Sequence, residues 1–105
     1  MGGSGSGGWS PTVPSNPCGN IRLRASVNSP QARTLQSLNL GDVLTIELQQ
    51  TPSVSLIVTY NGAIVGSLTG FSMTQIINCI ENGNLYSATV VELNGGNCTV
   101  QVESM

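Results

Sequence analysis

The chain has 105 residues and a mass of 10.9 kDa, a length that fits one domain with a single modest core. It carries three Lys+Arg, five Asp+Glu and no His, and only 8% of its residues are charged. The lack of histidine excludes a Ser-His-Asp or Cys-His catalytic set and any histidine-ligated metal site. Three cations are too few for the broad basic surface that most nucleic-acid-binding domains use.

The first 17 residues differ in composition from the rest. Residues 1–8 are a Gly/Ser run of the flexible-linker type, and Trp9, the single tryptophan, follows directly. We interpret residues 1–9 as an appended linker and absorbance tag; a native core role for Trp9 is the alternative. Residues 10–17 hold three of the five prolines and predict an extended lead-in. A single domain is therefore expected over residues 18–105.

Alternation of apolar and polar residues predicts five or six strands. In residues 21–27 every second side chain is apolar, and Arg22 and Arg24 lie on the opposite face. Residues 43–48 alternate in the same way. Residues 54–60 are apolar on both faces, which predicts the central strand of the sheet.

Two turn signals predict hairpins. Asn61-Gly62 can form a two-residue turn with positive φ at both positions, and it connects residues 54–60 to residues 63–68. Asn94-Gly95-Gly96 lies between two alternating segments, residues 86–93 and 97–103. The free edges of the terminal strands of such a sheet are expected to accept a partner strand.

One short helix is predicted at about residues 72–82, between the fourth and fifth strands. Ser72 and Gln75 fit a capping box, Phe71 and Ile76 fit a hydrophobic staple, and Gly83 fits a helix stop. Four apolar residues at helical spacing form one stripe: Met73, Ile76, Ile77 and Ile80. The fold class is therefore mostly β, a small, partly closed barrel that the helix plugs at one end.

The three cysteines, Cys18, Cys79 and Cys98, are widely spaced and odd in number, unlike a disulfide framework or a Cys-x-x-Cys metal pattern. This favours separate thiols in a reducing cytoplasm, with a Cys18–Cys98 bridge between the terminal strands as the alternative. We expect no metal and no other cofactor. No apolar run approaches the roughly 20 residues that span a bilayer, and no signal-peptide pattern is present, so no membrane association is expected.

Short motifs between residues 41 and 93 follow a characteristic order along about half of the chain. They are Gly41-Asp42, Val58-Thr59-Tyr60, Val65-Gly66-Ser67-Leu68, Ile76-Ile77, Gly83 and Tyr86-Ser87-Ala88-Thr89-Val90. In this order they resemble the HIRAN domain. The resemblance implies a small β-barrel that accompanies helicases and nucleases, and it implies binding of single-stranded DNA ends. Residues 49–53 depart from the family's Asn-Pro-x-Asp loop, so the resemblance assigns no DNA-contacting residue here.

Five residues are candidates for a binding site: Arg22, Arg24, Arg33, Tyr60 and Tyr86. On one strand face, the guanidinium groups of Arg22 and Arg24 would lie about 7 Å apart and could grip a phosphate or carboxylate. The alternative is that they face solvent and pair with Glu92 or Glu103 across the sheet. The alternative for Tyr86 is that it closes the barrel mouth, a role that needs no ligand.

No arrangement of carboxylates or activated thiols suggests catalysis, so we do not expect an enzyme. The first hypothesis is a non-catalytic binding or adaptor domain that engages a protein or peptide partner. The alternative is recognition of single-stranded DNA ends, as the HIRAN resemblance implies.

Overall fold

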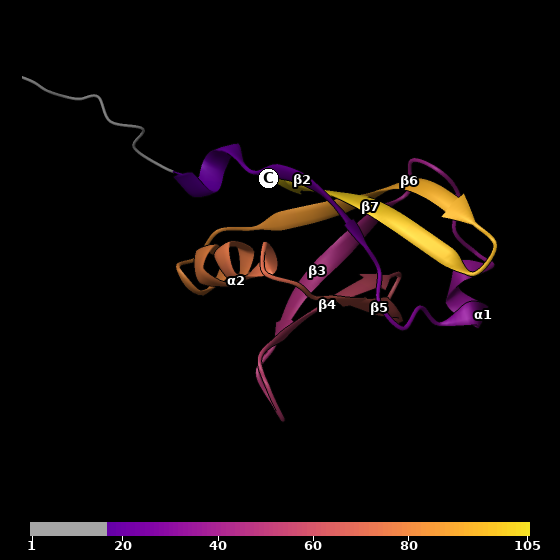
Figure 1. Cartoon of the computed structure of the whole chain (residues 1–105), viewed down its shortest axis with the longest axis horizontal. Helices are drawn as coiled ribbons and strands as arrows, with labels where there is room; N and C mark the ends of the chain where they lie inside the picture. The colour runs from indigo at the N-terminus through magenta and orange to yellow at the C-terminus, as the bar shows by residue number, and fades with distance from the viewer. Residues whose placement is uncertain (1–16) are drawn as a thin grey trace, which may run out of the picture.

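Six antiparallel strands form one sheet in the order β2-β7-β6-β3-β4-β5. In this computed structural model, residues 17–105 are described; the expected linker, Trp9 and most of the lead-in lie outside them. The strands are β2 (Arg22–Ser26), β3 (Val43–Gln49), β4 (Ser55–Tyr60), β5 (Ala63–Leu68), β6 (Tyr86–Asn94) and β7 (Asn97–Ser104). The sheet curls into a half-barrel, with α2 and α1 at opposite ends (Figure 1). The prediction of a mostly β, partly closed barrel is confirmed.

Both predicted hairpins are present. Asn61 and Gly62 have φ of 52° and 85°, and Tyr60 pairs with Ala63 across the turn. These positive φ values are typical of the two-residue turn whose twist matches that of the flanking strands. The β6–β7 hairpin also closes through a two-residue turn, with Asn94 paired to Asn97, but of its two turn residues only Gly95 has a positive φ (64°).

The strand order corrects two expectations. Residues 54–60 were expected to form the central strand, but β4 lies next to the edge strand β5, and β6 and β3 occupy the middle of the sheet. The last strand, β7, was expected to have a free edge, but it is paired on both sides, to β2 and to β6. An apolar pattern indicates how much of a strand is buried. Burial alone does not determine the position of the strand in the sheet. The two edge strands are β2 and β5.

The core fills the inner face of the curled sheet. Its largest fully buried side chains come from five strands and from α2. They are Leu44, Leu56, Leu68, Ile76, Val58, Val65, Val90, Val100, Val102 and Cys98. In β3 and β7 the positions alternate as the sequence predicts, so one set of side chains faces inward and the other faces solvent.

Helix α2 (Met73–Glu81) covers one end of the half-barrel and buries Met73, Ile76 and Cys79. It ends as predicted: the Gly83 amide donates to the Ile80 carbonyl and the Asn84 amide donates to the Cys79 carbonyl, the two bonds of a Schellman motif. Among residues 17–105, no helix is long and apolar enough to cross a membrane.

The start of α2 differs from the prediction. Ser72 is itself helical (φ −65°, ψ −19°) and its side chain makes no capping hydrogen bond. The first helical amides are instead satisfied by backbone turns, from Met73 to the Gly70 carbonyl and from Thr74 to the Phe71 carbonyl. Phe71 is 94% exposed, so the predicted staple with Ile76 is not formed. The capping-box and staple predictions were therefore wrong.

The N-terminal turn η2 (Pro17–Asn20) is attached to the barrel by a disulfide between Cys18 and Cys79. Both sequence-based expectations for these cysteines, separate thiols or a Cys18–Cys98 bridge, were wrong. Cys79 lies on the buried side of α2, where η2 passes. Cys98 is unpaired and buried.

Two hydrogen bonds to backbone carbonyls of η2 strengthen this attachment. The Tyr86 hydroxyl donates to the Cys18 carbonyl over 2.7 Å, and the Ser104 hydroxyl donates to the Gly19 carbonyl over the same distance. The start of β2 is therefore fixed to α2, to β6 and to the end of β7.

Within residues 17–105, the half-barrel is closed where the segment after β2 meets β5, through the Asn28–Ser67 bridge and a hydrogen bond from the Gln31 amide to the Val65 carbonyl. Past the end of β2, the Asn28 amide donates to the Ser67 carbonyl (2.7 Å) and the Ser67 amide donates to the Asn28 carbonyl (3.0 Å). Nearby, Gly66 lies so close to residues 27–30 that a Cβ atom there would be 2.4 Å from Val27 Cγ1 and 2.7 Å from the Asn28 carbonyl oxygen. A glycine at this position thus lets the two edges meet. The chain continues into the short helix α1 (Ala32–Leu35).

Candidate functional site

The outer edge of β2 presents backbone groups with no strand beside them. At its two ends, the Ser104 amide donates to the Ile21 carbonyl and the Val27 amide donates to the Cys98 carbonyl, both toward β7. Because the direction of these groups alternates along an antiparallel strand, every second residue between Ile21 and Val27 directs its amide and carbonyl away from β7. The residues with outward backbone groups are Arg22, Arg24 and Ser26.

The neighbouring edge strand does not reach this part of β2. β5 bonds to the segment that follows β2, at Asn28 and at Gln31, whose amide donates to the Val65 carbonyl, and the Asn28 side chain bonds to the Thr69 hydroxyl. Beyond Thr69 the chain turns into α2. Within residues 17–105, no backbone hydrogen bond joins the outward groups of Arg22, Arg24 or Ser26 to another segment. We call these three residues the β2 edge.

The inner face of β2 is also incompletely covered. Its apolar side chains, Leu23 and Ala25, are only half-buried, although they pack against the core. On the paired strand β7, Val100 and Val102 are completely buried. The difference follows from the missing neighbour of β2, since a further strand would cover these side chains.

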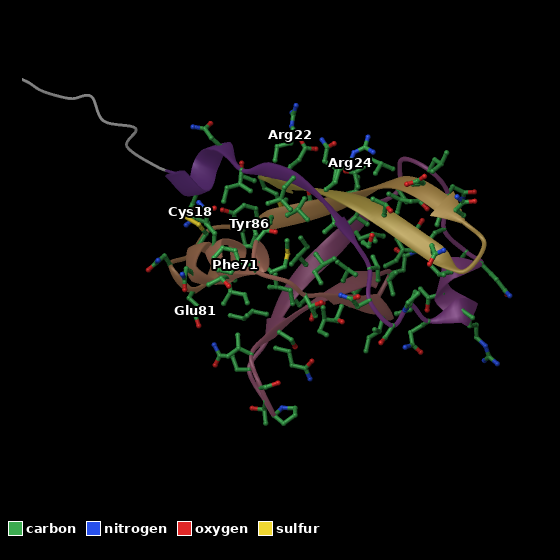
Figure 2. All side chains as sticks on the ribbon, viewed as in Figure 1. Cys18, Arg22, Arg24, Phe71, Glu81 and Tyr86 are labelled. Atoms are coloured by element: carbon green, nitrogen blue, oxygen red, sulfur yellow. A yellow bond between two sulfur atoms is a disulfide. The ribbon has the colours of Figure 1, made fainter. Side chains whose placement is uncertain are left out.

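The two arginines of the β2 edge project from the same face of the strand, away from α2 (Figure 2). Arg22 forms an ion pair with Glu103, its cross-strand partner, with Nε 2.9 Å from Oε2. This pair is mostly exposed and contributes about 0–1 kcal/mol. Arg24 faces the neutral Gln101 instead and has no ion pair with any residue of the described chain. The predicted pairing with Glu103 is thus confirmed for Arg22.

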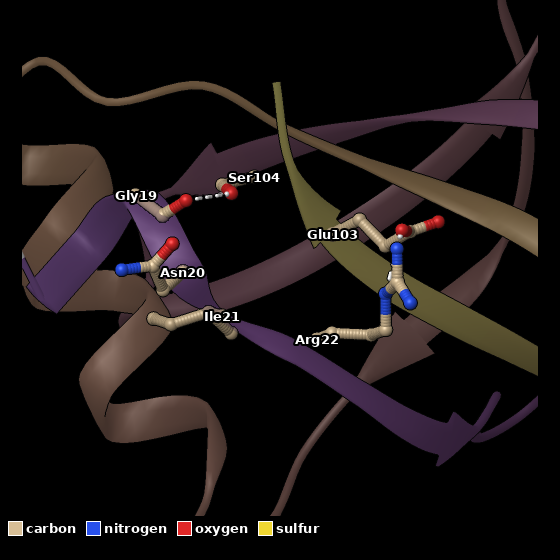
Figure 3. A pocket seen from close by; sticks show the side chains of 6 residues that line it. All are labelled: Gly19, Asn20, Ile21, Arg22, Glu103 and Ser104. Carbon is tan, nitrogen blue, oxygen red and sulfur yellow. Dashed lines mark hydrogen bonds and ion pairs between the residues drawn. The ribbon is translucent and has the colours of Figure 1, made fainter.

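An open hollow of about 380 Å³ lies where β2 begins (Figure 3). Its polar groups already bond to one another, as the Arg22–Glu103 ion pair and the hydrogen bond from Ser104 to Gly19 show. The lining residues are Gly19, Asn20, Ile21, Arg22, Glu103 and Ser104. The hollow therefore leaves the beginning of the β2 edge open to solvent.

The other three predicted site residues lie elsewhere. Arg33 and Tyr60 line a second hollow, of about 280 Å³, between α1 and the β4–β5 turn. Tyr86 is 4% exposed, and its hydroxyl is bonded to the Cys18 carbonyl. This burial removes Tyr86 from the surface that a partner can contact and agrees with its alternative role of closing the barrel. The five residues thus occupy three separate places.

Phe71 was not proposed as a site residue. It follows Thr69 by two residues, so it lies where the chain leaves the end of β5 near the β2 edge, and it is almost fully exposed. Figure 2 shows it beside α2. A phenylalanine side chain in this position has a large apolar surface with little intramolecular cover, as is common for residues that anchor a partner.

Cys98 is the one unpaired cysteine of the described residues, and it faces the core from β7. Burial raises the pKa of its thiol, because the thiolate is poorly solvated in the core. Its location in the apolar interior indicates a packing role.

We expect stability to decrease as the pH rises above the ordinary thiol pKa of about 8.5. In this range the unfolded chain releases the Cys98 proton while the folded chain, whose pKa is raised, retains it. Urea midpoints measured between neutral and mildly alkaline pH should fall for the natural chain. They should fall less steeply for Cys98→Ala; equal slopes for the two proteins would contradict the assignment.

Known proteins give information on the fold only. No family model matches the chain, and no curated protein matches it. A crystal structure of a Lactobacillus plantarum protein, a structural genomics target, superimposes with a TM-score of 0.65 at 13% identity, covering 80% of this chain and 95% of that one. This likeness shows that a similar fold occurs in another protein of known structure.

Proposed function

We propose that this is a non-catalytic binding domain that accepts an extended peptide segment of a partner protein as an added strand on the β2 edge. The observation that carries the proposal is the set of unpaired backbone groups at Arg22, Arg24 and Ser26. Extended peptides bind to free sheet edges through main-chain hydrogen bonds, with alternate side chains providing specificity. The added strand would run antiparallel to β2, in line with β5, in the position that β5 leaves after Thr69.

The groups at this edge suit holding a ligand better than transforming one. They are amides, carbonyls and guanidinium groups, none of which serves as a general base near neutral pH. Three residues can exchange up to about six main-chain hydrogen bonds, each contributing about 1 kcal/mol net before the entropy of association is subtracted. Because the entropy of association offsets most of this gain, side-chain contacts must add to the main-chain bonds, and with them we expect dissociation constants of about 10–100 µM.

The disulfide supports an oxidising compartment for the domain, since such bonds persist mainly outside the reducing cytoplasm. The cytoplasmic location expected from the sequence rested on unpaired thiols, and that premise no longer holds for Cys18 and Cys79.

Proline substitution on the edge tests the proposal. Peptides are first selected from a random phage-displayed library against the oxidised domain, and their affinities are then measured for two variants. Arg24→Pro removes an amide that points away from β7, so the β2–β7 pairing is retained while strand addition is blocked. Arg24→Ala is the control, because it removes the same side chain and keeps the amide.

We expect the selected peptides to bind Arg24→Pro about tenfold or more weakly than Arg24→Ala, a difference of about 1.4 kcal/mol. Equal affinities, or no enrichment of any peptide, would overturn the proposal. A short single-stranded oligonucleotide tests the HIRAN-like alternative, for which binding should be detectable and should weaken steeply with salt.

A further inference from the structure

We infer that the partner segment alternates acidic and apolar residues, with the acidic side chains beside Arg24 and the apolar ones toward Phe71 and the inner face of β2. This inference rests on the proposed function and names the class of peptide that the β2 edge selects. It follows from three features of the described residues: a cation without a partner, half-buried apolar side chains and an exposed aromatic ring.

The first feature sets the charge of the outer positions. Side chains of adjacent strands that face each other on the same face of a sheet interact directly, favourably for opposite charges and unfavourably for like charges. Arg22 already pairs with Glu103, whereas Arg24 has only Gln101 across from it on β7. A carboxylate on the added strand would give Arg24 the partner that the domain itself does not supply.

The second and third features set the inner positions. An added strand directs every second side chain to the inner side of the barrel, where Leu23 and Ala25 are half-buried. Phe71 lies in the turn between β5 and α2, two residues after Thr69 and next to the position that this strand would occupy, and almost all of its surface is exposed. Apolar side chains at the inner positions would cover both groups and gain hydrophobic free energy.

The same charges disfavour a second copy of this chain as the occupant. If two β2 edges paired antiparallel about Arg24, the two Arg24 side chains would face each other, and a shift of register would place Arg22 opposite Arg24. Like charges directly opposite one another destabilise a strand pair, and cations on edge strands are a known protection against self-association. The β2 edge is therefore suited to a different chain.

Fluorescence anisotropy with defined peptides tests the inference on the oxidised domain. The probe is a labelled peptide of about eight residues in which glutamate alternates with valine. Two further peptides serve as comparisons: one with lysine in place of each glutamate, and one with the same composition in which all glutamates precede all valines. We expect only the alternating acidic peptide to bind in the micromolar range.

Two pairs of variants separate the charge from the apolar contact. Arg24→Glu should weaken binding of the acidic peptide about tenfold and improve that of the lysine peptide. Arg33→Glu, an equal charge change on α1 at the other end of the molecule, should change it less than about twofold. Phe71→Ala should weaken binding about fivefold, and Val43→Ala, at an exposed position on β3, should have little effect.

The inference is overturned if the lysine peptide or the block-ordered peptide binds as well as the alternating acidic one, or if Arg33→Glu has the same effect as Arg24→Glu. The inference fails, while the proposed function stands, if none of the defined peptides binds but library-selected peptides still distinguish Arg24→Pro from Arg24→Ala. Failure of that proline test would instead remove the proposed function.

Discussion

Removal of the Cys18–Cys79 disulfide is expected to lower the free energy of unfolding by about 4 kcal/mol. The two cysteines are 61 residues apart, and a crosslink that closes a loop of this length restricts the unfolded chain by about that amount in the chain-entropy model. Small domains are stable by about 5–15 kcal/mol in total, so this bond provides a large part of the stability. Urea unfolding with and without a reductant measures the effect directly.

The double variant Cys18→Ala/Cys79→Ala is the control for this prediction. It should unfold at the same low urea concentration as the reduced natural chain, and adding reductant to it should change nothing. Because η2 is also bonded to Tyr86 and Ser104, the reduced domain is still expected to fold. A urea midpoint that does not change on reduction would contradict the prediction.

Gly66→Ala is expected to destabilise the domain by about 3 kcal/mol. The added Cβ would come within 2.7 Å of the Asn28 carbonyl oxygen, and this backbone atom cannot move without disturbing its bond to the Ser67 amide. The substitution therefore disrupts the contact between Asn28 and β5 that helps to close the half-barrel. Thermal or urea unfolding of the purified variant gives the change in stability.

Gly96→Ala provides a matched control, because a Cβ at that position has no atom within 4 Å and its φ is not in the left-handed region. This variant should unfold within about 0.5 kcal/mol of the natural chain. If both substitutions had equal effects, the close approach of Gly66 to Val27 and Asn28 would not be the cause of the destabilisation.

The local structure of this chain follows closely from its sequence. Alternation in residues 43–48 predicts the inward positions of β3, Asn61-Gly62 predicts a tight turn, and Gly83 predicts the end of α2; all three are confirmed. These features depend on neighbouring residues and on the burial of one face, which periodicity records directly. The capping box failed because Ser72 adopts a helical conformation, and backbone turns replace its side chain.

The candidate site could be predicted only in part, because it depends on contacts between distant segments. The β2 arginines and their shared face follow from alternation, but the strand order decides that β2 is an edge and that β7 is not. The partner of Cys18 depends on where α2 crosses η2, which cysteine spacing does not record. Phe71 is exposed for a similar reason, since no segment of residues 17–105 folds over the turn that precedes α2.

The hydrogen bond from Ser104 to Gly19 has a consequence for protein engineering. It places the entry and exit of the folded unit side by side, as the position of the C-terminus next to the start of β2 also shows (Figure 1). A host protein could therefore carry this unit inside one of its surface loops without separating the ends of that loop. Joining the two ends and opening the chain at Gly95-Gly96 should likewise yield a circular permutant that folds.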